Sequence, residues 1–121
     1  MSARVPNTTG SPRVPNKQGR IANLVRFRTD DWEAVEAYVS AHGLKKQEYY
    51  DRACEAFLSS HEQNEPIQYA LTPIGNGYRA INVYLLPEDH NSLRKIADDT
   101  QIAIGRVVAT AVLHLIQPPA E

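Results

Sequence analysis

The chain has 121 residues, a usual length for one domain, and 42% of them are apolar, which is enough for a hydrophobic core. Its formal net charge is −1, and the single cysteine, Cys54, excludes an internal disulfide and favours a reducing cytoplasm. No run of about 18 apolar residues is present, and residues 1–20 lack the apolar stretch of a secretory signal. Neither a membrane span nor a membrane partner is therefore expected.

Positive charge gathers near the N-terminus. Residues 1–60 contain nine Lys/Arg and seven Asp/Glu, whereas residues 61–121 contain four and seven. Residues 1–20 hold Arg4, Arg13, Lys17 and Arg20, with no acidic residue, among many Pro, Gly, Asn, Ser and Thr residues. This composition predicts a flexible basic tail over residues 1–20. Such a tail either follows a phosphate backbone or simply keeps the protein soluble.

The first element expected after the tail is a strand over residues 23–28, because polar and apolar residues alternate there with a period of two. One face would carry Asn23, Val25 and Phe27, and the other Ala22, Leu24 and Arg26.

A helix should follow from Thr29, a good N-cap residue, up to a stop at Gly43. Its apolar stripe consists of Trp32, Val35, Tyr38 and Val39. A second helix is expected over residues 45–59, with Tyr50, Ala53, Cys54 and Phe57 on one face. Residues 21–60 thus form one strand–helix–helix unit, and Trp32 and Phe27 are expected in its core.

Residues 61–78 are a polar connector with two prolines and an Asn-Gly turn signal, and residues 67–71 are a candidate for a short extra strand. A second unit is expected over residues 79–117. Its strand, residues 80–85, would turn Ala80, Asn82 and Tyr84 to one side. Pro87 suits the first turn of a helix. The last helix carries the strongest helical period of the chain, Ile104, Val107, Val108, Ala111, Val112 and Leu115, and residues 118–121 form a short tail.

The two units overlay without a gap at an offset of 58 residues, residues 21–58 on residues 79–116. Only four pairs are identical: Ala22/Ala80, Val25/Val83, Asp31/Asp89 and Ala53/Ala111. What repeats is the apolar pattern. A unit of about 40 residues cannot bury its apolar face alone, so each unit is expected to be the partner of the other.

Residues that would indicate an enzyme are not arranged for one. The four histidines share no metal-ligand spacing, and Gly75-Asn76-Gly77 is too short for a phosphate-binding loop. Cys54 lies on the apolar stripe of its helix, which favours a buried thiol over a nucleophile. We therefore expect no enzyme, no cofactor and no metal site.

The strand, helix, glycine turn and second helix of LVRFRTDDWEAVEAYVSAHGLKKQEYYDRACEAF and INVYLLPEDHNSLRKIADDTQIAIGRVVATAVLHL resemble the ribbon-helix-helix unit of the MetJ/Arc class. Two units in one chain resemble the tandem arrangement of TraY-type conjugation accessory proteins. The resemblance implies a mostly α fold with a short β-ribbon, in which two βαα units form an intramolecular pseudo-dimer. It also leaves open that the repeats pair between chains.

In the family, the ribbon enters the major groove of double-stranded DNA. By resemblance, the groove-facing side chains are Leu24 and Arg26 in the first unit and Asn82 and Tyr84 in the second, together with Ala22 and Ala80. Arg26 suits guanine and Asn82 suits adenine, while Leu24 contacts apolar groups. Because the two strands differ, the resemblance implies a non-palindromic site.

The family anchors phosphate at the start of its second helix, and the matching residues are Lys45 and Lys46. These two cations oppose the helix dipole unless an anion docks there. The alternative is that both lysines bend into solvent at little cost. Arg20 and Arg28 flank the first strand and are further candidates for contacts with the DNA backbone.

The sequence thus leads to two functional hypotheses. The first is a cytoplasmic DNA-binding protein, either a transcriptional repressor or an accessory factor at a plasmid transfer origin. The second is a protein-interaction module that keeps the fold with little DNA affinity and binds a relaxase, a toxin or a copy of itself. The acidic second half and its missing phosphate anchor motivate the second hypothesis.

Overall fold

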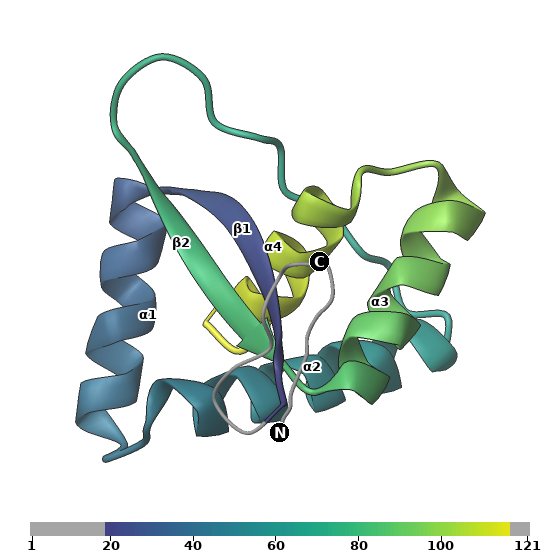
Figure 1. Cartoon of the computed structure of the whole chain (residues 1–121), viewed down its shortest axis with the longest axis horizontal. Helices are drawn as coiled ribbons and strands as arrows, with labels where there is room; N and C mark the ends of the chain where they lie inside the picture. The colour runs from purple at the N-terminus through teal and green to yellow at the C-terminus, as the bar shows by residue number, and fades with distance from the viewer. Residues whose placement is uncertain (1–18, 117–121) are drawn as a thin grey trace, which may run out of the picture.

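The computed structural model describes residues 19–116 (Figure 1). Six elements follow one another: β1 (Ile21–Arg28), α1 (Thr29–Ala41), α2 (Lys46–Glu62), β2 (Tyr78–Leu85), α3 (Pro87–Thr100) and α4 (Ile104–Leu113). The protein is therefore mostly helical, with one two-stranded antiparallel sheet. The predicted tails lie outside the described residues, apart from the last two residues of the basic tail. None of the described helices is long and apolar enough to cross a membrane.

The sheet register is centred on one residue pair. Leu24 lies opposite Asn82, and these two residues are 58 positions apart, the offset of the sequence repeat. On either side the partners exchange: Ala22 lies opposite Tyr84, and Arg26 lies opposite Ala80. This pairing is the one expected for two equivalent strands that are related by a local two-fold rotation.

A residue with the same left-handed φ follows the first helix of each unit. Gly43 follows α1 with φ +62°, and Gln101, which lies 58 residues later, follows α3 with φ +62°. This left-handed conformation ends the helix and lets its last carbonyls find new donors. Glycine adopts it without strain, whereas Gln101 has a Cβ and compensates in part by donating from Nε2 to the carbonyl of Asp98 (2.8 Å).

The second helix of each unit packs on the strand of the other unit. α4 contacts β1, α2 contacts β2, and α2 and α4 also contact each other. The Tyr49 hydroxyl of α2 donates a hydrogen bond to the carbonyl oxygen of Val112 in α4, and burial raises the pKa of Tyr49. The remaining helices are placed unequally, because α1 lies along the ribbon whereas α3 packs on α2 and α4 (Figure 1).

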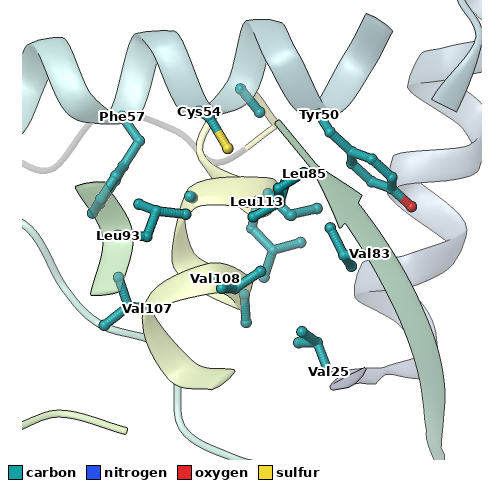
Figure 2. Packing of buried hydrophobic residues seen from close by; sticks show 14 of the residues in the cluster. Val25, Tyr50, Cys54, Phe57, Val83, Leu85, Leu93, Val107, Val108 and Leu113 are labelled. Carbon is teal, nitrogen blue, oxygen red and sulfur yellow. The ribbon is translucent and has the colours of Figure 1, made fainter. Parts of the chain in front are cut away.

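One hydrophobic core joins all six elements. The side chains of α2, α3, α4 and both strands point into the same space, as Figure 2 shows for Val25, Cys54, Val83, Leu93 and Val108. Phe27 and Trp32 are buried as the sequence predicts, with ring centroids 5.2 Å apart. At about 25 cal/mol per Å² of apolar area, such mutual burial is the main source of stability.

The connector between α2 and β2 has no regular structure, so the extra strand expected at residues 67–71 is not formed. Two α4 side chains hold it instead. The backbone N–H of Ala70 donates to Thr110 Oγ1 (2.9 Å), and Arg106 Nε donates to the Ala70 carbonyl (2.8 Å). α4 itself ends at Leu113 rather than continuing through Leu115, because residues 114–116 close tight turns onto Ala111 and Leu113.

Candidate nucleic-acid interface

One face of the ribbon is turned away from the core. Because side chains alternate along a strand, the register places Ala22, Leu24, Arg26 and Arg28 beside Tyr84, Asn82, Ala80 and Tyr78, respectively. Most of these residues are exposed, whereas Val25, Phe27, Val83 and Leu85 on the opposite face are buried. The buried face is what requires this register, since a slip by one residue would expose the core side chains.

The four side chains expected to read bases all lie on this outer face. Leu24 and Asn82 form its central pair, and Leu24 has an exposed fraction of 68%. Arg26 and Tyr84 each lie two cross-strand pairs from the centre, toward opposite ends of the ribbon. The Arg26 guanidinium carbon is 5.1 Å from the ring centroid of Tyr78, a cation–π contact that orients the arginine across the face.

Three arginines lie near one end of the ribbon. Arg26, Arg79 and Arg28 occupy three successive cross-strand pairs, and all three are exposed. None of them forms a salt bridge with another described residue. This arginine end carries positive charge that is not tied up in salt bridges among the described residues.

The sequence alone did not single out Arg79, because it alternates with Ala80 and Asn82 on the strand and so belongs to the core-facing set. In the structure it is nevertheless exposed, although it lies opposite the buried Phe27, because it is the second residue of β2, near the end of the ribbon. An antiparallel pairing of the two repeats would have indicated the position of Arg79, since it places residues near the start of β2 beside the end of β1.

Arg20 is held by contacts within the protein. Its relative exposure is only 9%, and its two terminal nitrogens donate to the two carboxylate oxygens of Asp51 at 2.9 and 2.8 Å. The same guanidinium donates to the carbonyl of Tyr84 (3.3 Å), and hydrogen bonding to Asp51 raises the pKa of Arg20. Three of its five N–H donors are used in this way and the side chain is nearly buried, which makes Arg20 a weaker candidate for a contact with the DNA backbone than the sequence suggests. Arg28 remains exposed.

The two lysines lie at the start of α2, as the sequence predicts. Lys45 is the N-cap residue and is exposed, and its backbone N–H donates to Glu48 Oε1 (2.8 Å). Lys46 has its ammonium nitrogen 3.8 Å from Glu36 Oε2 and 5.2 Å from the ring centroid of Trp32. Such an exposed ion pair contributes less than about 1 kcal/mol. The Lys46 ammonium is therefore not firmly held.

The start of α4 differs from the start of α2. Ala103 is its N-cap residue, and no cation stands where the first unit has Lys45 and Lys46. Arg106 lies in the first turn of the helix but donates to the connector carbonyl at Ala70. The second unit thus lacks the lysine pair, and its nearby arginine has a partner within the chain.

Two places outside the ribbon carry reactive side chains, the thiol of Cys54 and the contact between Ser60 and His114. Cys54 is fully buried, and burial raises the pKa of its thiol to about 12, so the reactive thiolate is suppressed. Ser60 Oγ lies 3.3 Å from His114 Nε2, but no carboxylate orients this ring among the contacts of residues 19–116. Those residues also contain no cluster of three or more potential metal ligands.

Comparison of the chain with protein-family models, with curated proteins and with solved structures found no match.

Proposed function

We propose that the protein is a single-chain ribbon-helix-helix protein that binds double-stranded DNA by inserting its β-ribbon into the major groove. The observation that carries this proposal is the register centred on Leu24 and Asn82, which leaves one ribbon face exposed. The strand–helix–helix order occurs twice along the chain, and α2 packs on β2 while α4 packs on β1. These features and the register support a pseudo-dimer within the chain.

The outer face of the ribbon would read DNA bases, and the cations around this face would contact the DNA phosphates. A two-stranded β-ribbon fits the major groove, and Arg26 and Asn82 are side chains that pair well with guanine and adenine edges. Leu24 would contact a thymine methyl group, and Tyr84 would donate to a base or a phosphate. Arg28, Arg79, Lys45 and Lys46 would provide the salt-dependent contacts with phosphates.

The charge along the ribbon is unequal, which gives the proposed complex a direction. The arginine end carries Arg26, Arg28 and Arg79, whereas near the other end Arg20 is neutralised by Asp51. Phosphates should therefore be held most strongly beside the arginine end and beside the start of α2. The expected site is non-palindromic, in a repressor operator or a plasmid transfer origin, and the cytoplasm is the proposed location.

The first experiment is selection of bound duplexes from random DNA, followed by fluorescence anisotropy with the selected duplex and a scrambled duplex. Arg26→Ala should reduce the preference for the selected duplex by about 5- to 100-fold, because a bidentate base contact is lost. Arg28→Ala and Arg79→Ala should weaken both duplexes equally and lower the salt slope by about one each.

The matched control is Arg52→Ala, which removes an exposed arginine of α2 outside the ribbon and should change neither affinity nor preference. Equal losses on both duplexes for Arg26→Ala would remove its role in readout. Failure of the wild-type protein to bind either duplex at about 50 mM salt would contradict DNA binding and favour the protein-interaction hypothesis.

A further inference from the structure

A groove runs along the edge of β1 that faces away from β2. It is lined by Leu24, Arg26 and Arg28 of β1 and by Leu71 and Pro73 of the connector, with Ala109 of α4 at its base. Its two adjoining parts have volumes of about 150 and 380 Å³. Successive β1 residues line it and no β2 residue does, so it follows the strand edge rather than one face. We call it the edge groove.

The strand edge in the edge groove has no strand beside it. β1 pairs only with β2 in the described part of the chain, and no backbone hydrogen bond joins β1 to residues 66–74. An unpaired edge presents a row of N–H and C=O groups at the spacing that another strand requires. Extended peptides bind other proteins by adding to edges of this kind.

The connector is held away from this edge by contacts with helices. Thr110 and Arg106 of α4 take up both backbone polar groups of Ala70, and the Tyr69 ring lies edge-on to Phe57 of α2 with centroids 6.4 Å apart. These contacts keep the connector from closing onto β1 as a third strand. The edge groove is therefore built into the fold by three helix side chains.

The chemistry of the edge groove is apolar and mainly cationic. Leu24 and Leu71 are 68% and 77% exposed, large fractions for leucine side chains on a soluble domain. Arg26 and Arg28 line the groove with a single carboxylate, Asp31, and neither arginine forms a salt bridge with a described residue. An occupant with apolar and acidic side chains would match both features.

We propose that the edge groove binds an extended acidic peptide segment of a partner protein, which adds to β1 as a third strand. Residues 24–28 span about 14 Å, which accommodates four or five residues of an extended chain. Backbone bonds to β1 would supply affinity. Acidic side chains facing Arg26 and Arg28 and an apolar side chain facing Leu71 would supply selectivity. This proposal does not depend on DNA binding.

The test uses the full-length protein and four synthetic hexapeptides with blocked termini. Two peptides alternate Val and Glu in the two possible registers, one alternates Val and Lys, and one is a Val/Glu peptide N-methylated at alternate residues. Binding is followed by the shifts of backbone amide signals in NMR titrations. We expect at least one Val/Glu peptide to shift the amides of residues 24–28. The Val/Lys and N-methylated peptides should bind at least about tenfold more weakly, because the first reverses the charge match and the second removes edge hydrogen bonds.

Two exposed connector residues provide a matched pair of variants. Leu71→Asp introduces a charge into the wall of the edge groove and should weaken the Val/Glu peptide at least about fivefold. Ile74→Asp makes the same kind of change at a residue that is 86% exposed and does not line the groove, so it should leave binding unchanged.

Three outcomes would overturn the proposal. The first is that neither Val/Glu peptide shifts the β1 amides at millimolar concentration. The second is that the Val/Glu and Val/Lys peptides bind equally well. The third is that Leu71→Asp and Ile74→Asp have the same effect. Binding of duplex DNA to the outer ribbon face would shift the side-chain signals of Asn82 and is a separate result, so loss of either activity is recognisable by itself.

Discussion

The two arginines at the ends of β1 have different surroundings in this protein. Arg20 precedes β1 and Arg28 is its last residue, but only Arg28 is exposed. Arg20 meets Asp51 because α2 crosses below the ribbon there, and the bidentate pair ties the start of β1 to α2. The difference therefore depends on which helix residue lies opposite each arginine in space.

Replacing Arg20 should destabilise the protein without a specific effect on nucleic acid. Arg20→Met removes charge-assisted hydrogen bonds from a largely buried site, and we expect the free energy of unfolding to fall by about 2 kcal/mol. Urea denaturation followed by circular dichroism measures the change. Arg52→Met, an exposed substitution on the same helix as Asp51, is the control and should change stability by less than about 0.5 kcal/mol.

Arg20→Lys separates geometry from charge in the same measurement. Lysine keeps the positive charge but cannot reach both carboxylate oxygens of Asp51 in the fork geometry. We therefore expect it to recover less than half of the lost stability. Full recovery would show that charge alone, rather than the paired hydrogen bonds, stabilises the start of β1.

At the scale of single elements, the two units end their first helices alike with different residues. Gly43 and Gln101 share φ +62°, although one has no side chain beyond its Cα and the other has a long one. The turn into the second helix therefore constrains the backbone more tightly than it constrains the residue type. At this position the two units therefore agree in backbone φ although they differ in residue type.

Two glycine substitutions should have opposite effects on stability. Gly43→Ala places a Cβ in a left-handed conformation and should lower the free energy of unfolding by about 1 kcal/mol. Gly105→Ala acts within α4, where an added Cβ meets nothing within 4 Å, and should raise it by about 0.5–1 kcal/mol. Thermal unfolding of both variants checks the pair. The same sign for both would contradict the assigned backbone conformation.

At the scale of the whole molecule, neither half is complete without the other. α4 covers β1 and α2 covers β2, so the contacts that bury each strand come from the opposite half of the chain. Tyr49 and Val112 add a hydrogen bond across the same boundary. The core is therefore shared rather than divided between two domains.

Cutting the chain in the connector should produce two fragments that fold only together. The exposed bond between Ile74 and Gly75 is a suitable point, because it lies beyond the contacts of Ala70 with α4. Fragments 1–74 and 75–121 should each lack cooperative unfolding in circular dichroism, since each loses the partner of its apolar face. An equimolar mixture should recover a cooperative transition. A cooperative transition for either fragment alone would contradict a shared core.

The sequence by itself determined the elements and their faces. Its two periods, 2 in the strands and 3.6 in the helices, predicted both strands and all four helices, because apolar residues must reach a core at regular spacing. It also placed Leu24 and Arg26 on one face of the first strand and Asn82 and Tyr84 on one face of the second, and the family resemblance implied that these faces are shared. The 58-residue offset indicated that the two units are partners.

Only the tertiary structure decided how individual polar residues are used. It paired Arg20 with Asp51, held the connector to Arg106 and Thr110, and brought Arg79 beside Arg26 and Arg28. Periodicity cannot report such pairs, because they join residues far apart in the chain whose polar groups have several possible partners. Burial of apolar residues follows a local pattern, whereas the choice of a hydrogen-bond partner depends on where the packed helices bring each group.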